Sequence, residues 1–446
     1  MSSLLHRSLS TTPPTVVSGR GARLTDDKGR VYLDASGGAA VSCLGHGNER
    51  VRRAIAAQLD AIAYAHTGFF TNEPAERLAT ALVARAPEGF GSGRAMFLGS
   101  GSEAVEAALK LARQYHVERG EPQRYRIVAR EMAYHGNTLG ALATGGHRQR
   151  RAPYLPMLAE VARIPACFPY RGRHEGEDEE AFGRRMADAL EDEILRLGPQ
   201  TVAAFVAEPV AGASLGSVPP AAGYFARIRD ICDRHGVLFI ADEVMCGSGR
   251  TGSFFALEQE GVSADIITLA KGLGAGFQPI AAVLACGKVV EAIAGGSGTL
   301  WHGHTYMSHA VGCACALAVL EELDERDLLA NVRRQGHKLG QKLLARFGQS
   351  AHIGDVRGRG LFWSVEIVAD RTTKAPFDPR LKMAAMFKKR AQELGLLCYP
   401  SSGCVDGERG DHVLVAPPYD VEDDDLDLIV DLMGRTLDDC IAVAGT

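Results

Sequence analysis

The stretch LFIADEVMCGSGRTGSFFALEQEGVSADIITLAKGL, residues 238–273, decides the predicted fold and site of this chain. Two short apolar runs within it, residues 238–241 and 266–269, have the length and composition of strands buried in a parallel sheet. Asp242 closes the first run, and Lys271 comes just after the second. Ligands bind at the carboxyl ends of the strands in such sheets, so we expect both side chains to lie at a ligand site.

Asp242 and Lys271 each have an ordinary alternative role, since a lone aspartate at a strand end can cap a helix and a lone lysine can lie on the surface. Together they fit one chemistry. A lysine amine forms an imine with an aldehyde. A carboxylate beside a pyridine nitrogen keeps that nitrogen protonated, which makes the ring an electron sink. The pair therefore favours an enzyme whose cofactor carries an aldehyde on a pyridine ring.

The middle of the chain alternates between strand and helix patterns. Strands are predicted at residues 95–98, 124–129, 201–207, 237–241 and 266–269, and helices at residues 102–116, 224–234 and 309–323. This alternation predicts an α/β fold in which helices cover a mostly parallel sheet.

The two ends of the chain carry a different pattern. Strands are predicted there at residues 30–33, 354–368, 396–399 and 412–416, with an amphipathic helix at residues 331–347. We therefore expect a small domain built from both termini. The predicted boundaries are residues 1–60 for its N-terminal part, 61–325 for the large central domain and 326–446 for its C-terminal part.

A turn rich in Gly and Ser, residues 99–102, leads from a predicted strand into a predicted helix. Free N–H groups and hydroxyls at a helix N-terminus form an anion site, here suited to a phosphate, and Ser100, Gly101 and Ser102 are the candidates. The spacing matches neither a Walker loop nor a dinucleotide-binding loop. A simple helix cap by Ser102 is the alternative.

Two further loops combine polar and aromatic residues. Tyr134 and His135 follow the strand predicted at residues 124–129, where an aromatic ring either lies flat on a cofactor or is an ordinary loop residue. Thr305 precedes an apolar helix and either caps that helix or reaches a phosphate.

The composition of the 446 residues is globular, with 46% hydrophobic and 23% charged residues. The formal net charge of −5 is small for this length, so nothing indicates binding to nucleic acid or to an anionic membrane.

Ten cysteines without a C-x-x-C pair indicate reduced thiols. Residues 1–12 lack the apolar core of a signal peptide. We therefore expect a cytoplasmic protein, and no metal site is predicted.

These motifs together resemble those of class III aminotransferases, a subgroup of the fold-type-I pyridoxal-phosphate enzymes that includes ω-amino acid, ornithine, GABA and amine transaminases. The stretch 238–273 resembles the family signature. Further landmarks occur in the family's order: SGSEAVEAALKLA at residues 100–112, YHG at 134–136, AEPV at 207–210, HTY at 304–306 and VRG at 356–358. The resemblance implies a large domain with a mostly parallel seven-stranded sheet, and a small α+β domain from both termini.

The resemblance also implies pyridoxal 5′-phosphate as cofactor and suggests its contacts. Lys271 matches the residue that holds the cofactor as a Schiff base and shuttles the proton, and Asp242 matches the partner of the pyridinium nitrogen. The other implied contacts are Val244 and Tyr134 on the two ring faces, Ser100, Gly101 and Ser102 at the phosphate, Glu208 in an orienting role, His135 in support, and Thr305 reaching the phosphate of a second subunit. The last contact implies a homodimer or higher homo-oligomer.

Departures from better-known members bear on the substrate. Amine-accepting relatives often carry Trp or Tyr where this chain has the small residues ASGGAAV at 35–41. This implies a roomier pocket, unless Phe69 or Phe70 fills the space. Arg409 lies two residues out of register with a mobile arginine that binds the substrate carboxylate in several members, and a surface arginine is the alternative.

The predicted function is transfer of an amino group from an amine or amino acid to a 2-oxo acid, pyruvate or 2-oxoglutarate, by a ping-pong mechanism. One alternative is another pyridoxal-phosphate reaction on the same fold, such as that of a racemase, aminomutase or decarboxylase, because only the pocket differs. The other is a non-catalytic binding protein. The intact Lys271 and Asp242 argue against this second alternative.

Overall fold

The computed structural model describes residues 2–445 and is built around a seven-stranded sheet. The strand order is β4-β10-β9-β8-β7-β5-β6. β10 runs antiparallel to both of its neighbours, and the other pairs are parallel, which confirms the predicted α/β fold. The strands are β4 (Arg94–Leu98), β5 (Arg126–Arg130), β6 (Ala162–Ile164), β7 (Val202–Ala207), β8 (Leu238–Asp242), β9 (Ile266–Leu269) and β10 (Ala281–Ala285).

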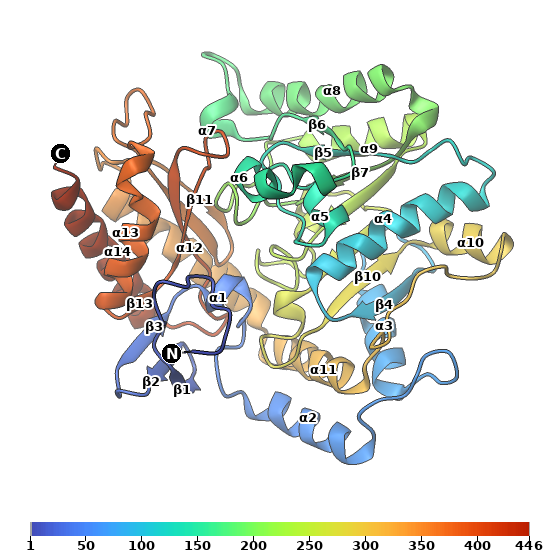
Figure 1. The fold of residues 1–446 in the computed structure, drawn as a ribbon, viewed down its shortest axis with the longest axis horizontal. Coiled ribbons are helices and arrows are strands. Elements are labelled where there is room, and N and C mark those ends of the chain that lie inside the picture. Colours follow the sequence, from blue (N-terminus) through green and yellow to red (C-terminus); the bar gives the residue numbers. More distant parts are fainter. Residues whose placement is uncertain (1, 446) are drawn as a thin grey trace.

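Helices cover this sheet on both sides (Figure 1). α4 packs along β9 and β10, whereas α8 and α9 pack against each other and against β6 and β8. The helices of this part are α2 (Glu49–Ala61), α3 (Glu73–Ala84), α4 (Gly101–Glu118), α5 (Leu139–Thr144), α6 (Arg148–Arg151), α7 (Pro169–Gly172), α8 (Glu179–Leu197), α9 (Tyr224–His235), α10 (Gly287–Gly295) and α11 (Ala310–Glu325).

Several helices begin at a capping side chain. Asn48, Asn72 and Asp178 cap α2, α3 and α8, because each side chain accepts a hydrogen bond from a backbone N–H in the first turn. Short 3₁₀ turns complete the connections: η1 (Ala152–Met157), η2 (Pro199–Thr201), η3 (Ala256–Glu260), η4 (Lys271–Leu273) and η5 (Pro379–Leu381).

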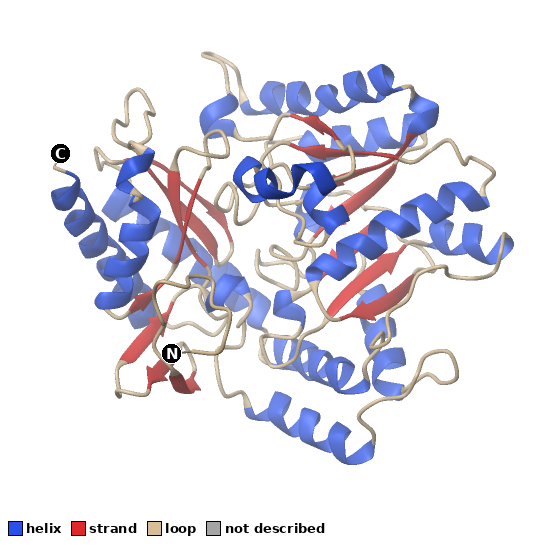
Figure 2. Cartoon of the chain, in the orientation of Figure 1, coloured by secondary structure: helices blue, strands red, loops and turns tan. Residues whose placement is uncertain are grey.

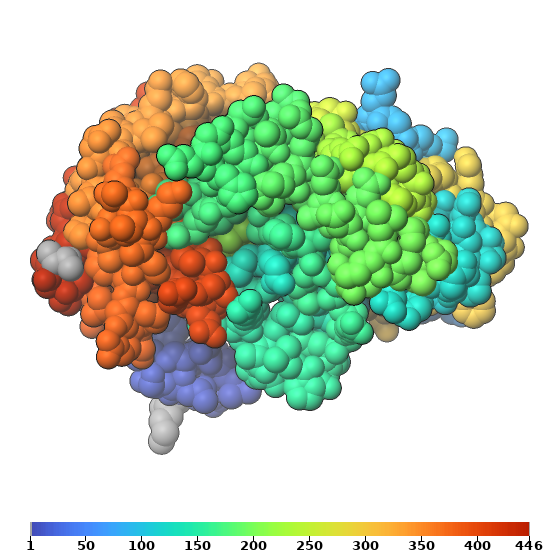
Figure 3. All heavy atoms as spheres, turned by 90° about the horizontal axis from the view of Figure 1, so that it is seen from above, coloured from blue at the N-terminus to red at the C-terminus, as the bar shows by residue number. Residues whose placement is uncertain are grey.

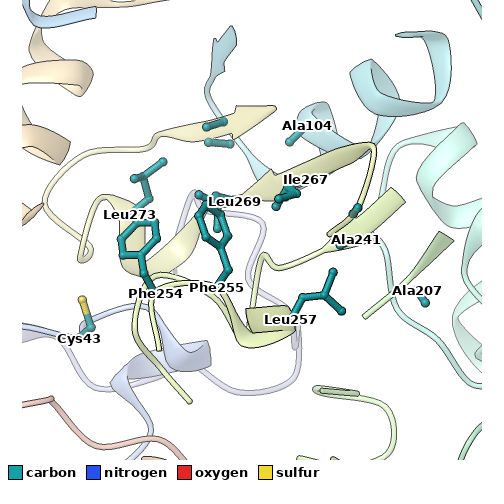
Figure 4. Close-up of a cluster of buried hydrophobic side chains, with 14 of the residues drawn as sticks. Cys43, Ala104, Ala207, Ala241, Phe254, Phe255, Leu257, Ile267, Leu269 and Leu273 are labelled. Carbon is teal, nitrogen blue, oxygen red and sulfur yellow. The ribbon is translucent and has the colours of Figure 1, made fainter. Parts of the chain in front are cut away.

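The centre of the large sheet is apolar on both faces. All residues of β7, β8 and β9 are buried, which explains their continuous apolar runs. Ile267 and Leu269 of β9 belong to the same buried cluster as Phe254, Phe255 and Leu257 (Figure 4). Burial of one such side chain contributes about 1.5–3 kcal/mol. The strand ends that carry Asp242 and Lys271 are therefore held by a well-packed core.

Two four-stranded sheets form the smaller part of the molecule, on the left in Figure 2. In the first, β13 from the C-terminal region pairs in parallel with β3 from the N-terminal region. This pairing joins the two ends of the chain. The elements are α1 (Gly37–Ala40), β1 (Val16–Arg20), β2 (Arg23–Asp26), β3 (Val31–Asp34), β11 (Ile353–Arg359), β12 (Phe362–Ile367), β13 (Leu396–Leu397), β14 (Tyr399–Ser402), β15 (Asp411–Val415), α12 (Leu328–Phe347), α13 (Met383–Glu393) and α14 (Asp423–Ala444).

The single strand region predicted at residues 354–368 is a hairpin of two strands, β11 and β12. The chain reverses at Gly360, whose φ of 59° is in the left-handed region that favours glycine. A Cβ at Gly360 would lie 2.5 Å from the backbone of Thr251, so the hairpin end packs closely against the large domain.

Within residues 2–445, no helix is long and apolar enough to cross a membrane.

Candidate active site

Loops that follow β4, β5, β7, β8 and β9 surround a cavity of about 280 Å³. These strands are parallel to one another, so their carboxyl ends meet at this edge of the sheet. The cavity brings together most of the residues predicted to contact a cofactor. They are Ser100, Gly101, Ser102, Tyr134, His135, Glu208, Asp242, Val244 and Lys271.

Asp242, the last residue of β8, is buried and bound by three donors. Its Oδ2 lies 2.7 Å from Nδ1 of His135. Its Oδ1 accepts hydrogen bonds from the backbone N–H of Val244 at 3.1 Å and from the hydroxyl of Thr268 at 3.2 Å. Nε2 of His135 is buried and has no hydrogen-bond partner within residues 2–445. The carboxylate is therefore fixed at the cavity wall from two neighbouring strands and one loop.

Lys271 lies in the turn after β9 and has a left-handed backbone, with φ of 47°. Such a conformation is uncommon for a non-glycine residue and is found preferentially at functional sites. Removal from water lowers the pKa of its amine to about 8, although the carboxylates of Asp242 and Glu208 act in the opposite direction. A large share of the amine is therefore neutral at mildly alkaline pH, which is the form that attacks carbonyls and accepts protons.

The N-terminus of α4 lies at the cavity. Ser100 is the helix cap, since its Oγ accepts from the backbone N–H of Glu103 at 3.2 Å. Ser102 is therefore not the cap, and its Oγ accepts instead from the backbone N–H of Asn137 at 2.9 Å. The backbone N–H groups of Gly101 and Ser102 make no hydrogen bond within residues 2–445. Unpaired N–H groups at the positive end of a long helix are suited to an anion.

Gly101 and Val244, which both line the cavity, lie close together. A Cβ at Gly101 would lie 2.8 Å from Cγ1 of Val244, so a larger residue would displace that side chain. The stretch 238–273 and the Gly/Ser-rich turn at residues 99–102 are therefore adjacent in space.

Glu208 follows β7 and is buried. Its Oε1 accepts from the backbone N–H of Tyr134 at 3.2 Å, and its Oε2 accepts from the backbone N–H of Gly212 at 2.8 Å. Burial raises the pKa of this carboxyl, while His135 and Arg130 act to lower it. Glu208 therefore holds the loop that places Tyr134 at the cavity.

Four predicted site residues lie outside the cavity lining. Thr305 is exposed, and its carbonyl accepts a hydrogen bond from the hydroxyl of Tyr64 at 2.9 Å. Phe69 and Phe70 are exposed to 81% and 68%. Nε of Arg409 donates to Asp406 at 2.7 Å, in an ion pair on the surface.

Sequence reasoning missed other residues at this site. Gln278, Pro279 and Val41 line the cavity. Gln278 and Pro279 precede β10, whose antiparallel direction does not follow from a strand–helix alternation. Arg150 was also missed, although its guanidinium carbon lies 4.8 Å from the centroid of the Tyr134 ring. The signal that could have identified it is the basic run of residues 148–151.

The residues present fit pyridoxal phosphate. Lys271 offers an amine of lowered pKa to an aldehyde, and Asp242 offers a fixed carboxylate to a ring nitrogen. The start of α4 offers unpaired N–H groups to a phosphate. Each part of the cofactor thus has a chemically matched group on the wall of a single cavity.

Comparison with known proteins identifies the family of the chain. The family model for class-III aminotransferases matches residues 6–437. An uncharacterised aminotransferase of Schizosaccharomyces pombe is 44% identical, with 98% of this chain and 95% of the relative covered. A taurine–pyruvate aminotransferase of Rhodobacter capsulatus is 39% identical, with 83% of this chain and 80% of the relative covered.

Solved structures show the same fold and the same type of cofactor. The ω-transaminase of Pseudomonas jessenii in complex with PMP has a TM-score of 0.91 and 33% identity, with 97% of this chain and 94% of that chain covered. The chain is a member of the class III aminotransferases, enzymes that transfer amino groups with pyridoxal phosphate.

Proposed function

We propose that this enzyme moves an amino group from an amine or an amino acid to pyruvate or 2-oxoglutarate in two alternating half-reactions. The observation that carries the proposal is the shared cavity of Lys271, whose pKa is lowered to about 8, and the fixed carboxylate of Asp242. When bound, pyridoxal phosphate supplies an aldehyde that captures amines and a ring that accepts electrons.

In this proposal the Nζ of Lys271 would accept the proton from the substrate carbon and later return it. Its amine is suited to this task because its lowered pKa lets it both accept and release a proton near working pH. General acid–base catalysis of this kind contributes roughly a hundred- to ten-thousand-fold. Asp242 stabilises the positive charge of the ring nitrogen, and His135 keeps the Asp242 carboxylate in position.

The remaining residues position the cofactor. With the cofactor bound, the N–H groups of Gly101 and Ser102 would hold its phosphate, and Val244 and Tyr134, which line the same cavity, would lie against its ring. Glu208 has an orienting role, because both of its oxygens are occupied by backbone N–H groups.

The proposed assembly is a homodimer or a higher homo-oligomer. Two pairs of exposed aromatic side chains are present, Tyr64 with Tyr306 and Phe69 with Phe70, and Tyr64 also donates a hydrogen bond to the carbonyl of Thr305. Exposed aromatic side chains of this kind are typical of protein interfaces. Burial of Tyr64 and Tyr306 against a second copy would bring Thr305 into an interface, where it could reach the partner's phosphate.

Pyruvate is supported as acceptor by the taurine–pyruvate aminotransferase relative. A cytoplasmic location is supported by the ten cysteines, which are all free and, apart from Cys398, buried.

The test is a panel of amines and ω-amino acids measured against pyruvate and 2-oxoglutarate, with each half-reaction followed by cofactor absorbance. Conversion of the cofactor to its amine form by a donor, and its return by a 2-oxo acid, is the expected result. A racemase, aminomutase or decarboxylase would turn over its substrate without a stoichiometric 2-oxo acid, and that result would reject the proposal.

A further inference from the structure

Arg357 is the arginine of the VRG motif, and its side chain is buried where β11 meets the large domain. Its Nη1 donates to the carboxylates of Asp355 at 3.0 Å and Glu366 at 2.8 Å. Its Nε donates to the carbonyl of Gly216 at 2.7 Å, and its Nη2 donates to the carbonyl of Leu215. The guanidinium therefore joins two carboxylates of the smaller part of the molecule to a loop of the large domain.

This loop, residues 211–218, follows β7 and is closed by two backbone hydrogen bonds between its end residues. Gly216 and Ser217 at its tip have left-handed backbones, with φ of 77° and 48°. Because this conformation is unfavourable for serine, contacts from outside the loop are needed to hold it. The hydroxyl of Ser364 of β12 supplies one by donating to Ser217 at 3.0 Å. In the space-filling view, the C-terminal part of the chain, in orange and red, lies directly against the green middle of the chain (Figure 3).

The 211–218 loop also holds the backbone that carries Tyr134. The hydroxyl of Ser214 donates to the carbonyl of Met132, a residue with a left-handed φ of 62°. A backbone N–H of the loop donates to one oxygen of Glu208 at 2.8 Å. The other oxygen of Glu208 accepts from the backbone N–H of Tyr134 at 3.2 Å. The loop is thus connected to Arg357 on one side and to the cavity residue Tyr134 on the other.

Pairing of charges does not by itself account for Arg357. Glu366 already binds a second arginine, Arg171 of α7, whose Nε donates to it at 2.7 Å. Replacing a buried ion pair by apolar residues is often neutral for stability. A guanidinium has donors in fixed directions, so it can bind acceptors of two segments at once, whereas a lysine ammonium lacks this fork. The guanidinium carbon of Arg357 lies 4.7 Å from the centroid of the Phe168 ring, a contact that helps to fix its plane.

We propose that Arg357 is a positioning residue of the active site, which acts through the 211–218 loop to hold Glu208 and Tyr134 in place. Among the described residues, those that line the cavity do not include Arg357, so it acts through the loop and not by contact with the cofactor. The placement of the Tyr134 ring then depends on the smaller part of the molecule. This inference rests on the proposed contact of Tyr134 with the cofactor ring.

Hydrogen exchange of the cofactor-free protein, followed by mass spectrometry, tests the connection. Arg357→Lys keeps the charge beside Asp355 and Glu366 but cannot bind all four acceptors. Peptides that contain residues 131–138 and 208–218 should exchange about tenfold faster, because hydrogen bonds from a charged donor to the loop are lost. Unchanged exchange of both peptides would overturn the proposal.

Arg171→Lys is the matched control. Arg171 binds the same carboxylate of Glu366, but its Nη1 donates to the carbonyl of Lys374, which lies outside the 211–218 loop. Exchange of both peptides should therefore stay within about twofold of the wild type. Equal acceleration by the two lysine variants would overturn the proposal, because Arg357 would then only stabilise the buried charge network.

Ser214→Ala tests the contact on the other side of the loop with Arg357 intact, and it is decisive also if Arg357→Lys does not fold. Exchange of the peptide with residues 131–138 should rise about two- to tenfold, the range for one neutral hydrogen bond. An unchanged rate would overturn the proposal, because the loop would then not hold the backbone before Tyr134.

Equilibrium dialysis measures the consequence for the cofactor. The Kd of pyridoxal phosphate should rise about two- to tenfold in Arg357→Lys, the range for an aromatic stacking contact, and stay normal in Arg171→Lys. In a Tyr134→Ala background, Arg357→Lys should add little further loss, and fully additive losses would overturn the route through Tyr134. If the wild type transfers no amino group, the proposed function fails, and hydrogen exchange still decides the role of Arg357.

Discussion

Lys271 is the only lysine that lines the active-site cavity within residues 2–445. Lys271→Ala should therefore bind the cofactor without a covalent link and lose turnover, while the exposed Lys28→Ala should behave as wild type. Borohydride reduction followed by mass spectrometry measures the link directly. An adduct that persists in Lys271→Ala would show that another amine holds the cofactor.

The lowered pKa of Lys271 predicts how the cofactor-free protein captures pyridoxal phosphate. Only the neutral amine attacks an aldehyde. Because burial lowers the pKa from its ordinary 10.5 to about 8, the capture rate should rise from pH 6 to about pH 8 and level off above it. Stopped-flow absorbance follows the reaction. A rate that keeps rising towards pH 10 would mean that the amine is not desolvated.

Asp242→Asn should preserve the fold and reduce kcat by about a hundredfold or more, because a neutral amide cannot stabilise the charge of the ring nitrogen. Thr268→Val removes one hydrogen bond to Asp242 and keeps the charge, so its loss should be about tenfold or less. Steady-state kinetics on both variants make the comparison. Near-normal turnover in Asp242→Asn would show that Asp242 has only a structural role.

At the scale of single residues, strand-end position was sufficient to predict that Asp242 and Lys271 lie at the same site. The contact between His135 and Asp242 was not predictable in its geometry, because it joins loops that are distant in sequence and meet only through the strand order. The cap at Ser100 shows the same limit, since the alternatives differ only by a shift of two residues at the helix start.

At the scale of elements, the segment 403–410 carries the predicted carboxylate-binding Arg409. Its turn is held by Asp406, whose Oδ1 accepts from the backbone N–H groups of Glu408 and Arg409 at 2.9 and 2.8 Å. The Asp406–Arg409 ion pair is exposed, with 56% of the Arg409 side chain accessible. Such pairs contribute about 0.2–1 kcal/mol, so Arg409 can leave this position at small cost.

Arg409→Ala should therefore sharply weaken the half-reaction with the 2-oxo acid and leave that with butylamine unchanged. Asp406→Asn retains an oxygen that can accept the turn N–H groups but releases the Arg409 side chain. It should raise kcat/KM for the 2-oxo acid by up to about fivefold, which corresponds to the lost ion pair. Equal losses in both half-reactions of Arg409→Ala would identify a structural arginine. No loss in either half-reaction would show that another residue binds the carboxylate of the 2-oxo acid.

Buried parallel strands were the most predictable elements. The strand predicted at residues 266–269 coincides with β9, and helix α9 differs from its prediction by one residue. β10 was not assigned, although its residues form an apolar run; its antiparallel direction is not encoded in such a run. The segment 396–399 was predicted as one strand, yet its residues divide between β13 and β14 in different sheets. Local patterns do not encode that division.

At the scale of the whole molecule, the exposed aromatic pairs Tyr64–Tyr306 and Phe69–Phe70 bear on assembly. The proposed dimer predicts that sedimentation of the wild type gives at least twice the monomer mass at working concentration. Phe69→Asp with Phe70→Asp should shift the protein towards monomer, because both charges would have to be desolvated in the interface. An active wild-type monomer would reject the proposed assembly.

Thr305 connects this assembly to the cofactor. Its side chain is exposed and outside the cavity of its own subunit, so a contact with phosphate requires the partner. Thr305→Ala should weaken cofactor retention by ~1.5–3 kcal/mol, the range for a hydrogen bond to a charged group, without altering the sedimentation coefficient. The double aspartate variant should lose cofactor to at least the same extent, because separating the subunits removes the same hydrogen bond. Equilibrium dialysis of the cofactor measures both variants. If Thr305→Ala retains the cofactor normally while the aspartate variant loses it, the interface supports the site through other residues and Thr305 does not bind the phosphate.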